Sequence, residues 1–154
     1  NYGRTPAAVY SMLGKADLLY GQRRMNEALE VYKKCLESGP PKIILPFVLT
    51  GLGSVQEDVK DYPGAIETYK RFTDEFPDHY MSPKIYESLA RVYEISLNPD
   101  AAREIYEKII TQYPSTFWAE KARQRYQVIS PQPFQNAPGQ SQPGQPAAPP
   151  KAGQ

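Results

Sequence analysis

Apolar residues recur at steps of three and four through most of the first 130 positions of the chain. This spacing places them on one face of a helix, so the pattern predicts a series of amphipathic helices. In residues 84–96, for example, Ile85, Leu89 and Val92 fall on a single stripe. We therefore expect an all-α chain over residues 1–130.

The helical pattern is itself repeated at a fixed spacing. Ala28, Ala65 and Ala102 are separated by 37 positions each. A tyrosine follows each alanine by four positions, a proline follows it by twelve, and a small residue precedes it by twelve. A period between about 20 and 50 residues indicates stacked supersecondary units. The repeated positions are Tyr32, Tyr69 and Tyr106, then Pro40, Pro77 and Pro114, and the small residues Ala16, Gly53 and Ala90.

Each unit is predicted to be a pair of helices that cross closely at the small residues. Thr5, Asp61 and Asn98 stand where a side chain caps a helix N-terminus, and Gly39 stands where glycine ends one. A last helix without a partner would cap the open end of the stack. We predict an α-solenoid with units at about 5–41, 42–78 and 79–114 and a capping helix at 115–129.

The composition changes abruptly after Ser130. Residues 131–154 contain seven Pro and six Gln, and Lys151 is their only charge. Such a segment buries too little apolar surface to offset the entropy of ordering, so we predict a disordered tail. A terminal spacer is the favoured role for this tail, and a Pro-rich docking peptide stays open as the alternative.

The charge balance and the few reactive residues argue against several classes of function. Eighteen Lys and Arg against seventeen Asp and Glu leave no basic excess for binding nucleic acid. Cys35 and His79 are the only residues of their kinds, so neither a cysteine or histidine metal site nor a paired nucleophile and base is expected. The longest apolar run, 43–49, is far shorter than the ~20 residues of a membrane span. We expect no enzyme activity, no metal, no cofactor and no membrane contact from these residues, while an anchor upstream of Asn1 stays open.

The repeated positions resemble the tetratricopeptide repeat (TPR) family, although its usual period is 34. The second unit carries the resemblance best, through Leu49, Leu52, Gly53, Tyr62, Ala65, Tyr69 and Pro77. The connections "EFPDHYMSP" and "QYPSTFWAE" are similar to those of bacterial cell-envelope members such as BamD, CpoB and YfgM. This resemblance implies an adaptor of the periplasm or envelope of a Gram-negative bacterium, with a cytoplasmic location as the alternative.

The first helices of such a stack line its concave side, where we expect a protein or peptide partner to bind. The clamp of Lys, Asn and Arg that chaperone-tail-binding members use for a terminal carboxylate is absent. A self-association module, or the repeat arm of a larger protein, are the alternative functions. The predicted groove residues run from an aromatic end to an exposed charged end: Tyr10, Leu13, Asp17, Tyr20, Phe47, Thr50, Ser54, Lys84, Glu87 and Arg91.

Overall fold

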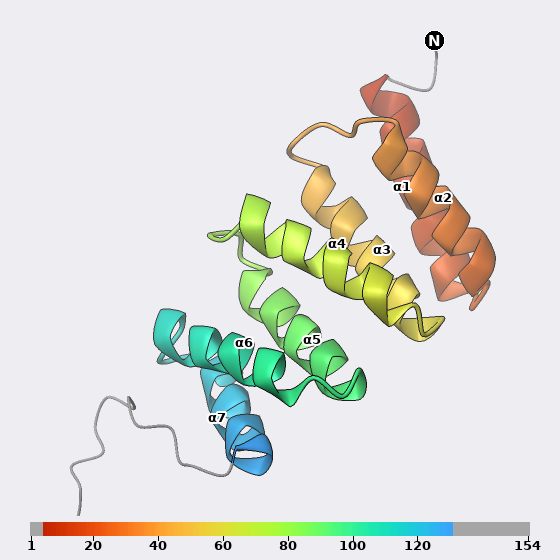
Figure 1. Ribbon diagram of the computed structural model, residues 1–154. Coiled ribbons are helices and arrows are strands. Elements are labelled where there is room, and N and C mark those ends of the chain that lie inside the picture. Colours follow the sequence, from red (N-terminus) through yellow and green to blue (C-terminus); the bar gives the residue numbers. More distant parts are fainter. Residues whose placement is uncertain (1–4, 131–154) are drawn as a thin grey trace, which may run out of the picture.

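The computed structural model describes residues 5–130, and every regular element in this range is a helix (Figure 1). The tail predicted for residues 131–154 lies outside the described residues. No helix between residues 5 and 130 is both long and apolar enough to cross a membrane. The helices are α1 (Pro6–Gly21), α2 (Met25–Glu37), α3 (Leu45–Asp58), α4 (Tyr62–Glu75), α5 (Ser82–Ile95), α6 (Pro99–Gln112) and α7 (Phe117–Ile129).

The helices pack in consecutive pairs that stack into a solenoid. α1 packs on α2, α3 on α4 and α5 on α6, while α7 packs on α6 and also contacts α5. In Figure 1 the second helices α2, α4 and α6 form the nearer layer, and the first helices lie behind them. We call the side formed by α1, α3, α5 and α7 the inner face and the side formed by α2, α4 and α6 the outer face. The predicted all-α solenoid of three helix pairs with a C-terminal helix is confirmed.

The two helices of each unit approach closely because small residues stand at their crossing. A Cβ atom added to Gly53 would lie 2.3 Å from Cε1 of Tyr69, so only glycine fits there in the present packing. Tyr69 is itself 1% exposed, and the ring fills the space that the missing side chain leaves. The other small residues predicted at the crossings are fully buried: Ala16, Ala28, Ala65, Ala90 and Ala102.

Polar side chains cap the N-termini of several helices, as the sequence predicts. The Thr5 hydroxyl accepts a hydrogen bond from the Ala8 amide at 3.2 Å, which satisfies one of the free amides at the start of α1. Asp61 and Asn98 cap α4 and α6 in the same way. Gly39, with φ +72°, follows the end of α2.

A residue with a left-handed backbone follows the end of each first helix by two positions. Arg23, Lys60 and Leu97 have φ values of 62°, 64° and 58°, and they are again 37 positions apart. The following amide bonds back to a carbonyl five residues earlier, as from Arg24 to Leu19 at 3.0 Å. This is the Schellman ending, which usually has glycine at the left-handed position.

The stack has two distinct edges. The connections between units, residues 38–44, 76–81 and 113–116, lie together on one edge, shown on the left in Figure 1. The turns within units lie on the opposite edge. We call these the connection edge and the turn edge. The first helices all begin at the connection edge.

Candidate functional site

Each unit bonds the buried tyrosine of its second helix to a carboxylate on its first helix. The three phenol rings are about 1% exposed, so their hydroxyls reach the inner face through the core. Burial is the largest cause that raises the pKa of each tyrosine, and the carboxylate partner raises it further. The bonds are Tyr32 to Asp17 at 2.5 Å, Tyr69 to Glu57 at 3.2 Å and Tyr106 to Glu94 at 2.6 Å.

Tyr20 occupies in the first unit the position that Glu57 and Glu94 hold in the next two. Its hydroxyl donates to Oδ2 of Asp58 at 2.8 Å, which joins α1 to α3. Partial burial and this hydrogen bond raise the pKa of Tyr20 to about 12. The side chain therefore acts as a link between units on the inner face.

Ion pairs join the units farther along the inner face. A carboxylate on one first helix meets a cation on the next, so the pairs run from α3 to α5 and from α5 to α7. Burial raises the pKa of Glu57, and the nearby Arg91 guanidinium opposes this shift. The pairs are Glu57 with Arg91, Glu87 with Lys121 (2.8 Å) and Glu94 with Arg125.

The cations of these pairs face solvent and the carboxylates lie beneath them. Side chains of the three cations are 42–46% exposed, whereas those of their carboxylates are 8–14% exposed. Arg91, Lys121 and Arg125 surround a pocket of about 230 Å³ together with Glu87 and Glu94. Because every one of these cations is already paired, the pocket offers hydrogen-bond donors without a large excess of charge.

The aromatic end of the inner face keeps two exposed rings. Tyr10 is 56% exposed in the second turn of α1, and Phe47 is 43% exposed in the first turn of α3. The Phe47 ring stands edge-on to the His79 ring, 6.1 Å between centroids. Apolar rings that packing leaves in water are the groups that contribute most to binding a partner.

The other predicted groove residues mostly have partners within the chain. Leu13 is half-buried and packs against the core of the first unit. The Thr50 hydroxyl donates to the carbonyl of Pro46 at 2.8 Å, and Ser54, one helical turn after Thr50, is half-buried. Lys84 is exposed as expected, but Glu87 is only 6% exposed because it lies under Lys121.

Lys121 and Arg125 are the inner-face residues that the sequence reasoning missed. They stand on α7, where the register of the repeat changes because the connection before α7 is shorter than the earlier ones. A signal did exist: the two residues are spaced by four, as Glu87 and Arg91 are, and follow them by 34 positions. This is the usual spacing of the repeat.

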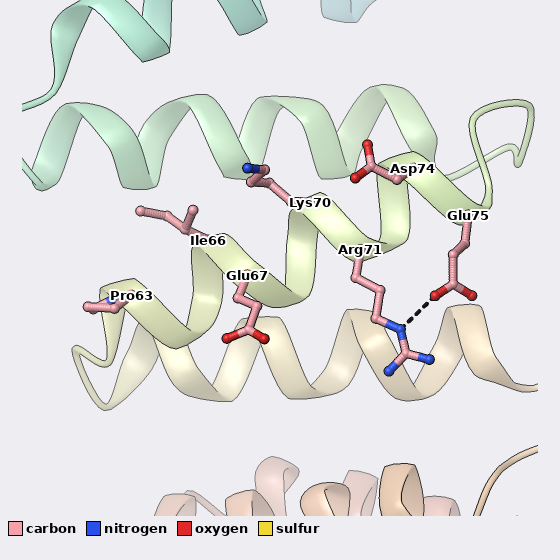
Figure 2. Close-up of a pocket in the computed structure, with 7 residues that line it drawn as sticks. All are labelled: Pro63, Ile66, Glu67, Lys70, Arg71, Asp74 and Glu75. Atoms are coloured by element: carbon pink, nitrogen blue, oxygen red, sulfur yellow. Dashed lines mark hydrogen bonds and ion pairs between the residues drawn. The ribbon is translucent and has the colours of Figure 1, made fainter.

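Another hollow lies on the outer face and makes a poorer candidate site. It measures about 480 Å³, and all of its lining residues belong to α4. Figure 2 shows them along one side of that helix, where Arg71 pairs with Glu75 at 2.6 Å. Binding sites gather side chains from several elements, and this hollow does not.

Neither lone reactive residue suggests catalysis. Cys35 is fully buried, and burial together with Asp17 raises the pKa of its thiol, so the nucleophilic thiolate is disfavoured. His79 sits among Phe47, Phe72 and Tyr80, and its Nδ1 accepts the Met81 amide at 3.3 Å. Within residues 5–130 no group of His, Cys, Asp and Glu could hold a metal ion.

Comparison with protein families identifies the repeat. Two models described as tetratricopeptide repeat match the chain, one at residues 9–40 and the other at 48–79 and 87–116. Together these matches cover more than half of the sequence and fall on the three helix pairs. The chain belongs to the tetratricopeptide repeat family. No curated protein matches it.

Solved structures share the fold at low sequence identity. One is the first TPR of Spaghetti (RPAP3) bound to the HSP90 peptide SRMEEVD, with TM-score 0.66, 16% identity, and 84% of this chain and 95% of that chain covered. The first TPR domain of human RPAP3 gives TM-score 0.65 and 16% identity, covering 81% and 94%. The C-terminal TPR-containing domain of an FK506-binding protein of Plasmodium falciparum gives 0.64 and 17%, covering 83% and 92%.

Proposed function

We propose that this protein is a non-enzymatic interaction scaffold of the bacterial cell envelope that binds a protein or peptide partner on its inner face. Tetratricopeptide repeats generally mediate protein–protein interactions, and a solved neighbour of the same fold was captured with a peptide. The observation that carries the proposal is the pair of rings Tyr10 and Phe47, which stay exposed on the inner face. Neither ring belongs to a buried hydrophobic cluster of the described residues.

The charges of the inner face indicate what kind of partner it suits. At the clamp positions of chaperone-binding relatives this chain has Leu13 and Asp17, Thr50 and Ser54, and Glu87 and Arg91. Arg91, the one cation among these six, is paired with Glu57. Asp17 accepts a bond from Tyr32, and Glu87 is neutralised by Lys121. A partner anchored by apolar side chains therefore fits better than one held by a terminal carboxylate.

The envelope location rests on the connections between units, which resemble those of envelope repeat proteins. Fractionation of the tagged full-length protein in a Gram-negative host tests this part. Release with the periplasmic fraction, or retention with the membranes, is the expected result. Recovery with the cytosol would place the scaffold elsewhere and leave its binding role untouched.

The binding role is tested by affinity purification from an envelope extract with matched variants. Tyr10→Ala/Phe47→Ala should lose the partners that the wild type retains, since truncating an aromatic anchor costs about 2 kcal/mol or more. Leu18→Ala/Leu97→Ala is the control, because these side chains are 62% and 89% exposed and lie away from the two rings. Equal recovery by both variants would show that the inner face is not the binding surface.

A further inference from the structure

All strongly exposed aromatic side chains of residues 5–130 lie at or next to the connection edge. Tyr10 and Phe47 stand in the opening turns of α1 and α3. Tyr80 lies in the connection between α4 and α5 and is 75% exposed, and Phe117, the first residue of α7, is 72% exposed. The turn edge and the outer face carry no ring of comparable exposure within the described range.

Each connection between units contributes one large apolar side chain to this edge. Ile43 precedes α3 by two positions and Tyr80 precedes α5 by two, so they are equivalent residues, 37 positions apart and both 75% exposed. At the third connection the corresponding residue is Phe117, which follows Tyr80 by 37 positions and is the first residue of α7. Side chains this exposed contribute little to the core, and their recurrence in every connection needs another reason.

Ring contacts and one hydrogen bond link neighbouring parts of this edge. The centroid of the His79 ring lies 6.1 Å from that of Phe47 and 4.6 Å from that of Tyr80. His79 therefore links α3 to the connection between α4 and α5. The Tyr113 hydroxyl donates to the Pro77 carbonyl at 3.2 Å and ties the last connection to the one before it. The edge therefore extends the aromatic end of the inner face across the units.

The connections and the helix starts at this edge carry balanced charge, and the last turns of α2 and α4 beside them add the exposed residues Lys34, Glu37, Asp74 and Glu75. The connections and the first turns of the helices that follow them carry two exposed cations, Lys42 and Lys84, and two exposed anions, Asp78 and Glu120. An anionic membrane surface would require a basic excess, which is not there. A partner that complements this edge is apolar and uncharged.

We propose that the connection edge, through Ile43, Tyr80 and Phe117, binds an extended, uncharged and apolar segment of the partner protein. This rests on the proposed function, because the segment continues from the rings Tyr10 and Phe47. Neighbouring helices pack about 10 Å apart and an extended chain advances about 3.3 Å per residue, so the two intervals between the three connections take at least roughly six residues. The partner thus lies across the units, with an apolar side chain at each connection.

A displayed library of random peptides of about twelve residues, selected on the full chain, tests this inference. We expect enrichment of uncharged sequences with spaced apolar residues. The most enriched peptide is then synthesised with a fluorophore and titrated against Ile43→Ser/Tyr80→Ser and Phe117→Ser. Each variant should weaken binding at least tenfold. Leu97→Ser, an equally exposed apolar site on the turn edge, should leave the affinity unchanged.

The other outcomes separate this inference from the proposed function. Unchanged affinity in the edge variants, with loss only in Tyr10→Ala/Phe47→Ala, would contradict binding at the connection edge. It would leave the inner face as the binding surface. Enrichment of acidic peptides would also overturn this inference, and selection of no peptide would count against both proposals. If the wild type forms concentration-dependent dimers that Ile43→Ser/Tyr80→Ser abolishes, the occupant of the edge is a second copy of the chain. If the wild type binds phosphatidylglycerol vesicles and this variant does not, the occupant is a membrane.

Discussion

Arg91 of α5 donates two hydrogen bonds to the carboxylate of Glu57 on α3, the longer of them 3.2 Å, and so joins two neighbouring units on the inner face. Glu57 also accepts the hydroxyl of buried Tyr69. The Glu57 side chain is 12% exposed, whereas that of Arg91 is 46% exposed. The carboxylate depends on its partners because little water reaches it.

Removing the arginine should therefore destabilise the stack. Arg91→Met leaves the Glu57 carboxylate without its counter-ion, at a cost of roughly 1–2 kcal/mol for a half-exposed pair. Burial holds the folded pKa of Glu57 above its unfolded value, so the folded state binds the proton more tightly. The deficit of Arg91→Met should accordingly be largest at neutral pH and shrink as the pH falls towards the pKa of Glu57. Urea denaturation of both proteins across this range checks it, and a deficit independent of pH would contradict the pairing.

The tyrosine bonds make a second prediction. Tyr106→Phe keeps the buried ring but removes the hydroxyl that donates to Glu94. A hydrogen bond to a charged group contributes about 1.5–3 kcal/mol, and the variant should lose stability of this order. Tyr10→Phe is the matched control, since that exposed ring should lose its hydroxyl at almost no cost. Equal melting temperatures for both variants would argue against the bond.

The same tyrosines predict alkaline behaviour. Burial and the carboxylates raise the pKa of Tyr32, Tyr69 and Tyr106 above the ordinary value of 10.0. A tyrosine that holds its proton more tightly when folded stabilises the protein below the unfolded pKa, and this stability is lost as the pH rises above it. Phenolate absorbance of these rings should appear together with the loss of helical circular dichroism. Their ionisation in a still helical protein would contradict the prediction.

Glycine at the helix crossing gives a packing test. Gly53→Ala forces a methyl group against the Tyr69 ring, and overpacking of this kind costs roughly 1–3 kcal/mol. Gly14 lies within α1 with no atom near a Cβ placed there. Gly14→Ala should instead stabilise the helix by roughly 0.5–1 kcal/mol. Thermal unfolding distinguishes the two, and the same sign for both would show that the crossing is not close.

The left-handed residue at the turn edge offers a stabilising change. Leu97 has φ 58° and is 89% exposed, so its side chain gains nothing from packing while the backbone is strained. Leu97→Gly relieves that strain and should stabilise the protein by roughly 0.5–1 kcal/mol after the added chain entropy of glycine is counted. Leu97→Ala keeps the strain and should show no gain. Chemical denaturation measures both, and destabilisation by Leu97→Gly would contradict the helix ending.

The sequence allowed the helix pairs to be predicted because local signals agree with one another. The alanines at the crossings, the caps at Asp61 and Asn98, and the spacing of the buried tyrosines all repeat with the same period. Inner-face contacts are harder to predict, since they join residues of different units. The ion pair of Glu87 with Lys121 depends on how α7 packs on α5, and the short connection before α7 shifts it out of the 37-residue register. Ile43, Tyr80 and Phe117 do recur at the 37-residue spacing, but this spacing alone does not separate a binding surface from a solvated loop.

The ion pairs between units also make each unit depend on the helix that follows it. The carboxylates of α5 are neutralised from α7, so a chain cut before that helix would expose Glu87 and Glu94 without the cations that cover them. Whole units therefore cannot be removed from the C-terminal end as interchangeable modules. Losing one end weakens the electrostatic balance of the unit before it, so the units are coupled, and we expect the array to melt cooperatively rather than one unit at a time.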